Sequence, residues 1–146
     1  MTGKLHAFDR PNSYIGRSVP RPDARRLLTG RGRFVDDKQL PRMVHAAFLR
    51  SPYAHAKVNA IDVANAKALQ GVVAVFTGKN LAEHVKPWSG VLTHLKGLRS
   101  PIQYPLAVDT ARWQGEPVAM VIAESRALAE DACALIDVDY EPLPAA

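Results

Sequence analysis

The five histidines are the first residues to test for chemistry, because imidazole can bind a metal or move a proton near neutral pH. His45 and His55 stand ten residues apart, and His84 and His94 repeat that interval. A zinc site needs three or four ligands in a closed geometry, and no cysteine or cluster of carboxylates completes such a set. We therefore assign no metal ligand, and expect His45 to be packed or on an edge strand and His55 to lie in a turn with a hydrogen-bond partner.

The serine and glycine residues do not have the spacing of a catalytic nucleophile motif or of a phosphate-binding loop. Ser51 and Ser125 lack the Gly-x-Ser-x-Gly context of a nucleophile elbow. Gly30-x-Gly32 and Gly71 do not extend to a Gly-x-Gly-x-x-Gly fingerprint, and no Walker loop is present. The pattern predicts no cofactor-binding residue.

Glu116 and Cys133 remain as isolated reactive groups. Glu116 stands between Gly115 and Pro117, where turn formation explains the sequence: glycine for the backbone and proline to open a strand. A role as catalytic acid or base is the open alternative. Cys133 falls in an alanine-rich stretch that favours a small buried hydrophobe over a reactive thiol. No catalytic residue is assigned.

The stretch from 114 to 123 organises the elements around these residues. Residues 117–123 are apolar without alternation, as in a strand buried on both faces. Ser125 is a candidate N-cap for a helix over 126–136, and 137–140 alternates like a half-buried strand. This order and length are those of a βαβ-type unit.

An earlier unit has the same order. Residues 43–50 predict a strand that is bulky on both faces and central in a sheet, and 56–61 predict a half-buried strand. Asp62 is a candidate N-cap for a helix over 63–70, which Gly71 would end before a strand over 72–77. The pattern favours one sheet-and-helix domain.

Charge separates an N-terminal arm from this domain. Residues 1–33 hold eight Lys or Arg against two Asp, whereas the remainder holds 11 basic and 12 acidic residues. We expect a basic, proline-containing arm over 1–24 and a single domain over 25–146, with a long irregular loop at about 80–105. Clustered cations are typical of nucleic-acid binding, but aromatic residues are sparse in the arm, so an arm that docks on a larger protein surface is favoured over nucleic acid.

The compartment follows from what the sequence lacks. Cys133 is the single cysteine, so an internal disulfide is impossible and a reducing compartment is expected. No run approaches the roughly 18 apolar residues of a membrane span. Arg25-Arg26 leads into Gly30-Arg31-Gly32 without the apolar region of an export signal. We expect a cytoplasmic protein without a membrane partner.

Several motifs, taken in order, carry a resemblance. They are Gly30-Arg31-Gly32-Arg33-Phe34-Val35-Asp36-Asp37, Leu40-Pro41-Arg42-Met43, Arg50-Ser51-Pro52-Tyr53-Ala54-His55-Ala56, Ile61-Asp62, Gly115-Glu116-Pro117-Val118-Ala119 and Val138-Asp139-Tyr140-Glu141-Pro142-Leu143-Pro144. Together they resemble the N-terminal segment of the molybdopterin-binding large subunit in the xanthine dehydrogenase, aldehyde oxidase and aerobic carbon monoxide dehydrogenase family. The match runs from about Ile15 to Pro144. Arg42 departs from the pattern, because the family usually has glycine there.

The resemblance implies an α+β fold, the α/β-hammerhead, with a mixed sheet and two main helices packed against it. It implies that the complete enzyme is an oxidoreductase that hydroxylates a substrate carbon with oxygen from water. That enzyme uses molybdenum in molybdopterin cytosine dinucleotide, [2Fe-2S] clusters and FAD. Its cofactor-binding loops and active-site glutamate lie in later domains, so no position here inherits a catalytic or cofactor-binding role.

Two functions from different classes remain. The first is a structural or assembly domain, or split subunit, of a molybdenum hydroxylase, non-catalytic on its own. Its partners would be the remaining molybdopterin-binding domains, the iron–sulfur subunit and the FAD subunit. The second is a freestanding binding module that uses the basic arm on nucleic acid or an acidic protein. The sequence indicates neither the substrate nor the role of the 80–105 loop.

Overall fold

The computed structural model describes residue 14 and residues 18–90, 92 and 94–145. By internal contacts the chain forms two units, Met1–Leu40 and Pro41–Ala146. The boundary lies later than residue 24, where the sequence analysis ends the arm. The arm and domain limits over 1–24 and 25–146 stay a prediction.

The described part of the first unit is short in regular structure. Helix α1 spans Ala24–Leu28, and the Thr29 hydroxyl donates a 2.8 Å hydrogen bond to the Arg25 carbonyl at its end. A 3-10 turn spans Val35–Asp37. The Phe34 N–H donates to the Asp37 carboxylate at 2.8 Å, and this local bond favours the turn over an extended chain.

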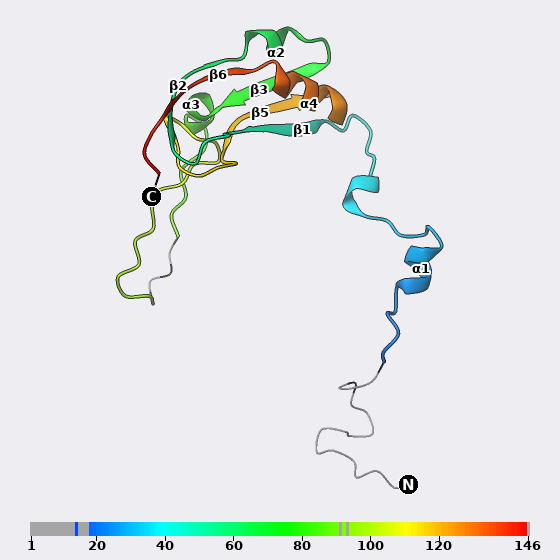
Figure 1. The fold of residues 1–146 in the computed structure, drawn as a ribbon. Coiled ribbons are helices and arrows are strands. Elements are labelled where there is room, and N and C mark those ends of the chain that lie inside the picture. Colours follow the sequence, from blue (N-terminus) through cyan, green and yellow to red (C-terminus); the bar gives the residue numbers. More distant parts are fainter. Residues whose placement is uncertain (1–13, 15–17, 91, 93, 146) are drawn as a thin grey trace, which may run out of the picture. The chain divides into compact units, whose positions relative to one another are not determined.

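The second unit contains two three-stranded sheets (Figure 1). Sheet A has the order β1 (His45–Arg50), β5 (Pro117–Ala123), β3 (Val72–Thr77). Sheet B has the order β4 (Thr110–Ala111), β2 (Ala56–Asp62), β6 (Asp137–Pro142). Each neighbouring pair is antiparallel. The strands are thus divided between two antiparallel sheets and are not joined in the one mixed sheet that was expected for an α+β fold.

The described residues of this unit also form three helices: α2 (Ala64–Ala68), α3 (Gly78–Ala82) and α4 (Arg126–Ala134). The expected start of α4 is confirmed, because the Ser125 hydroxyl accepts a hydrogen bond from the Leu128 N–H at 3.2 Å. Asp62 accepts from the Ala64 N–H at 2.9 Å at the start of α2. Gly71 has the expected left-handed φ of +88°, but α2 ends earlier, at Ala68 with Leu69 as its C-cap, so Gly71 does not end the helix as predicted.

Strand β5 is central in sheet A, as the sequence predicts, whereas the expected central place of β1 is wrong. β1 is an edge strand in which half-buried and exposed residues alternate. Ala46 and Phe48 are exposed, so apolar residues on both sides of this strand do not mean that both sides are covered. Apolar composition alone could not distinguish a covered face from an open one.

The prediction of a βαβ-type unit is also wrong. The order β5, α4, β6 is present, but β5 belongs to sheet A and β6 to sheet B, so the two strands never pair. The order β2, α2, β3 crosses between the sheets in the same way. β6 instead pairs with β2, and the exposed Lys57 ammonium lies 3.1 Å from the Glu141 carboxylate across that pair.

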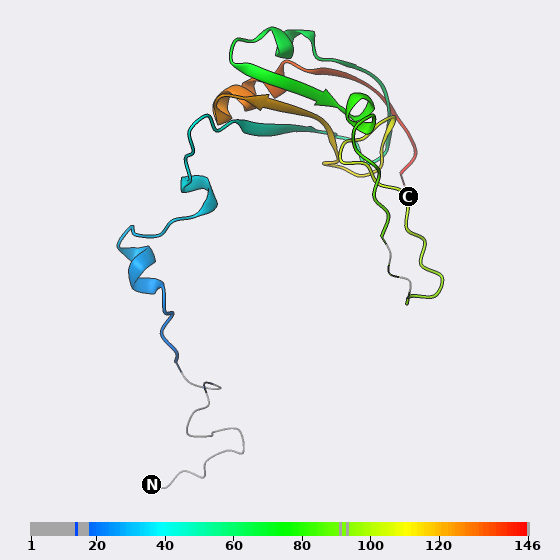
Figure 2. The same ribbon diagram turned by 180° about the vertical axis from the view of Figure 1, so that it is seen from behind.

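Small side chains let α4 lie close to sheet A. Figure 1 shows α4 over β1 and β5, and Ala129 and Ala132 of the helix are fully buried. Ala132 shares a core cluster with Ala119 and Val121 of β5, both also at 0% exposure. Because this packing is dense, we expect changes of side-chain volume on the face of β5 toward α4 to destabilise the fold. Figure 2 shows the same layers from behind.

Candidate functional site

The end of β1 and the entry to β5 are joined by three hydrogen bonds. The Ser51 N–H donates to the Glu116 carbonyl at 2.8 Å, and the Gly115 N–H donates to the Ser51 carbonyl at 2.8 Å. The Arg50 guanidinium donates to the Gly115 carbonyl at 2.9 Å. This junction fixes where β5 begins, beside the bulge between Leu49 and Arg50.

The Glu116 carboxyl is enclosed within the junction. The residue is only 3% exposed, and its carboxylate accepts a hydrogen bond from the Arg112 N–H. Burial raises the pKa of Glu116, against smaller lowering effects of the Arg112 N–H, the Arg112 charge and the Trp113 backbone. The carboxyl therefore closes the loop 112–116 from within.

The expected turn chemistry around Glu116 is confirmed. Gly115 has φ +85°, and β5 begins at Pro117. An acid or base must reach a substrate proton, yet Glu116 lines neither of the two cavities described below. The geometry favours a structural carboxyl over a catalytic one.

A second set of contacts ties the residues that follow β6 to the turn between β1 and β2. His55 Nδ1 lies 2.7 Å from the Pro144 carbonyl, so this nitrogen must carry the proton. The Leu143 N–H donates back to the His55 carbonyl at 2.9 Å. His55 is thus a turn residue with a hydrogen-bond partner, as predicted.

Two tyrosines pack beside these bonds. The rings of Tyr53 and Tyr140 have centroids 5.3 Å apart and tilt by 59°. Burial raises the pKa of Tyr140, and the nearby Ser51 hydroxyl lowers it by less. The Tyr140 hydroxyl has no partner of good geometry among the described residues. The contact is chiefly apolar packing.

Two of the cavities among the described residues lie within the second unit. One of about 410 Å³ is lined by Ala54, His55, Arg112, Trp113, Gln114 and Ala145. Another of about 250 Å³ is lined by Val58, Asn59, Ala60, Ile61, Thr77, Lys79 and Val108. Each contains one side chain with a fixed positive charge.

The remaining sequence candidates are scattered. His45 is half-buried on the edge strand β1, and His84 and His94 are exposed in the loop after α3. Within the described residues, no three His, Cys, Asp or Glu side chains are grouped so as to hold a metal ion. No described helix is long and apolar enough to cross a membrane.

The buried place of Cys133 on α4 confirms its prediction as a small core hydrophobe. Burial raises the pKa of the Cys133 thiol, with a further upward effect from Glu130 and a lowering one from the Val121 backbone. A protonated, enclosed thiol is a poor nucleophile.

The feature that sequence analysis missed is the face of sheet A opposite α4, which we call the outer face. Its two cross-strand rows are Ala46–Ile122–Ala74 and Phe48–Met120–Phe76. All six residues are exposed or half-buried, and Phe48 is 46% exposed. The alternation of exposed residues in β1 could have indicated this face only if the covered side were already known.

Comparison with known proteins adds the family. Residues 29–144 match the family model described as aldehyde oxidase and xanthine dehydrogenase, a/b hammerhead domain. The chain belongs to this family.

Related hammerhead domains occur within much longer proteins. The nicotine 6-hydroxylase large subunit of Paenarthrobacter nicotinovorans is 39% identical over 140 residues, covering 94% of this chain and 17% of that protein. The carbon monoxide dehydrogenase large chain of Afipia carboxidovorans is 43% identical over 119 residues, covering 82% of this chain and 14% of that protein. The chain thus spans about one sixth of these relatives.

Solved hammerhead domains have the same fold. Quinoline 2-oxidoreductase from Pseudomonas putida 86 superposes with a TM-score of 0.80 at 50% identity, over 90% of this chain and 16% of that one. The resemblance proposed from the motifs is confirmed.

Three of the motifs that carried this resemblance lie at or beside the junction. The Ser51 N–H and carbonyl, in the motif Arg50–Ala56, bond to the Glu116 carbonyl and the Gly115 N–H of the motif Gly115–Ala119. His55 bonds to Leu143 and Pro144 of the closing motif. Arg42, where the family usually has glycine, has φ 59° and is the one non-glycine residue with positive φ in the described chain. The backbone keeps the glycine-like conformation despite the substitution.

Proposed function

We propose that this chain is a non-catalytic structural domain of a molybdenum hydroxylase, an oxidoreductase of the xanthine dehydrogenase and carbon monoxide dehydrogenase type. Its role is to support the cofactor-bearing parts of that enzyme. The names of relatives support this class: they include a xanthine dehydrogenase molybdenum-binding subunit and the large chain of carbon monoxide dehydrogenase. The single cysteine is consistent with a cytoplasmic enzyme.

The outer face of sheet A is the observation that carries the proposal. It places six apolar side chains in two register-matched rows, and no helix of the described second unit covers it in Figure 1. Contiguous exposed apolar surface marks a place where another polypeptide packs. The remaining molybdopterin-binding domains are the proposed occupants, and the iron–sulfur and FAD subunits the further partners.

The residues of this chain do not fit the molybdopterin dinucleotide itself. A dinucleotide carries two phosphates, which proteins bind with helix N-termini, glycine-rich turns and grouped cations. Each described cavity instead contains one fixed cation, and the Arg112 guanidinium in the larger one already donates to the Thr110 carbonyl at 3.2 Å. We therefore propose that molybdenum, iron–sulfur and flavin groups are held by other polypeptide.

Elemental analysis of the purified chain tests this function. The expected result is a colourless protein without stoichiometric molybdenum or iron and without hydroxylase activity. Stoichiometric molybdenum, or turnover by the isolated chain, would overturn the proposal. A purified complex in which this chain co-migrates with molybdopterin-binding polypeptide would support it.

A further inference from the structure

The loop that follows α3 projects from the second unit and carries an unusual surface. Figures 1 and 2 show both of its limbs extending away from the two sheets. We call residues 84–90 the outgoing limb and residues 94–103 the returning limb. The Trp88 and Gln103 backbones exchange two 2.8 Å hydrogen bonds, and the Gly90 N–H donates to the Ser100 hydroxyl at 2.7 Å. These bonds hold the two limbs side by side.

Large apolar side chains on the limbs face water. Trp88 is 62% exposed, Ile102 58%, Leu98 49% and Leu95 48%. Exposing four such residues on one short loop forgoes the favourable free energy of removing their apolar surface from water. A loop of this kind gains stability when a second surface covers it.

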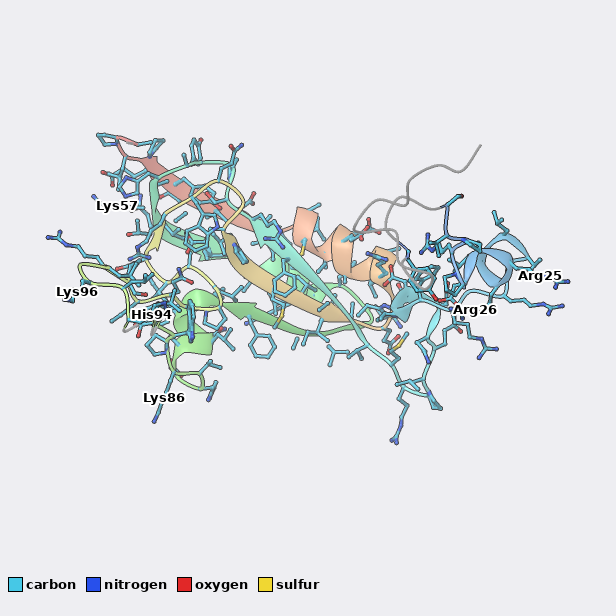
Figure 3. All side chains as sticks on the ribbon, turned by 90° about the horizontal axis from the view of Figure 1, so that it is seen from below. Arg25, Arg26, Lys57, Lys86, His94 and Lys96 are labelled. Carbon is cyan, nitrogen blue, oxygen red and sulfur yellow. The ribbon has the colours of Figure 1, made fainter. Side chains whose placement is uncertain are left out.

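The charge of the limbs is of one sign. Lys86, Lys96 and Arg99 are exposed, and the sequence from 84 to 108 contains no Asp or Glu. None of the three cations forms a salt bridge among the described residues. Figure 3 shows the side chains of Lys86 and Lys96 directed outward from the loop. The complementary surface must therefore supply carboxylates around an apolar centre.

We propose that the two limbs dock into an apolar groove bordered by Asp and Glu on a companion polypeptide of the same enzyme. This inference rests on the proposed function, because that function supplies the companion. The exposed Trp and Leu residues would fill the groove, and the three cations would meet its acidic rim. The site is separate from the outer face of sheet A, so the domain would hold its neighbours at two places.

A protein partner is favoured over a membrane or a nucleic acid. Much of the limb backbone lacks a regular hydrogen-bond partner, and such backbone is costly in lipid. Stacking on bases needs several aromatic rings, whereas the limbs carry the single aromatic residue Trp88. Relatives of this chain are named as subunits of larger assemblies, which provides a protein neighbour.

Site-specific photo-cross-linking in cells that make the whole enzyme tests the docking site. A benzophenone amino acid would replace Leu95 in the loop, Met120 on the outer face or Lys67 on α2, each in a separate variant. The expected result is a cross-link from position 95 to molybdenum-hydroxylase polypeptide, mapped to an apolar segment flanked by Asp or Glu. Position 67 should give none.

The three positions separate the two proposals. A cross-link from 120 but not from 95 would overturn the loop inference and leave the proposed function standing. No cross-link from either position would overturn both. A cross-link from 95 to a second copy of this chain would also overturn the inference.

Charge reversal sharpens the same test. Lys96→Glu should weaken the isolated complex on the order of tenfold at low salt, and less at high salt. Lys67→Glu changes the net charge equally and should leave the affinity within about twofold. Equal effects of the two variants would contradict a local acidic rim.

Sedimentation with lipid vesicles tests whether the loop binds a membrane instead. The full chain should not sediment with phosphatidylcholine vesicles, whether or not they contain phosphatidylserine. Sedimentation that requires phosphatidylserine and is lost in Lys96→Glu would identify the loop as a membrane contact and overturn the protein partner.

Discussion

On the face of sheet A that α4 covers, Ala119, Val121 and Ala123 are all 0% exposed. On the opposite face Met120 and Ile122 of the same strand are half-buried, beside a Phe48 that is 46% exposed. The residues are similarly apolar, so composition does not distinguish the faces. What differs is the covering: the side toward α4 buries all three of these residues of β5, whereas on the other side Val118 alone is fully buried, in a second core cluster, and Met120 and Ile122 stay partly open.

This difference implies that burial stabilises the isolated domain through one face and the proposed assembly through the other. A substitution on the covered face should act on folding, because its contacts already exist. One on the outer face should act on association, because its contacts would form only with a partner. Neighbouring residues of β5 provide matched tests.

The largest effect is expected from Val121→Ala. Val121 is fully buried between α4 and the sheet, so truncation loses burial and leaves a cavity, at about 1–3 kcal/mol. Ile122→Ala removes more atoms but from the half-buried face, and should cost below about 1 kcal/mol in the isolated chain. Urea unfolding of the two variants measures both values. Equal costs would mean that the two faces do not differ as described.

The second prediction concerns the register of β5, which decides which of its residues face α4. A one-residue slip of β5 would exchange its covered and open residues, and the junction at Gly115 opposes that slip. Gly115→Val should destabilise by roughly 1–2 kcal/mol, because φ +85° strains a side chain although no atom lies within 4 Å of the added Cβ. A loss near zero in thermal unfolding would show that the turn relaxes easily.

Arg42→Gly is the opposite control for this backbone effect. Arg42 already has φ 59°, so glycine removes strain there while adding freedom to the unfolded chain. The two effects oppose each other, and unfolding should shift by less than about 1 kcal/mol. A large loss would mean that the Arg42 side chain itself stabilises the fold.

Local signals in the sequence were sufficient for much of this fold. Ser125 before an alanine-rich run predicted the start of α4, and the apolar run at 117–123 predicted the central strand. Gly115 before Glu-Pro predicted a left-handed turn, which the structure has. Each of these follows from residues adjacent in the chain.

Long-range information was missing where prediction failed. The apolar residues of β1 predict burial on both sides, yet its place at a sheet edge depends on pairing with β5, some seventy residues away. The strand–helix–strand order predicts a unit, but the assignment of β6 to sheet B depends on β2. The junction around Glu116 includes a hydrogen bond from the Ser51 N–H, distant in the sequence, to the Glu116 carbonyl. Spacing along the chain contains none of these pairings.

The smallest effect is expected at Glu116, where pH can test how the junction holds β5. Burial raises its pKa in the folded state, so between the ordinary pKa and the raised one the folded protein holds more protons than the unfolded chain. Stability from this group is therefore fully present below its ordinary pKa and is lost as pH rises through the folded pKa. Glu116→Gln keeps an acceptor for the Arg112 N–H without titrating.

The measurement is the difference in unfolding free energy between the native chain and Glu116→Gln from pH 4 to pH 8. The native chain should lose stability relative to the variant as pH rises, since its carboxylate becomes charged in an enclosed site. A relative gain over the same range would mean that the loop N–H groups and the Arg112 charge outweigh burial. In that case the junction would hold an anion, and β5 would be fixed in register by charge rather than by enclosure.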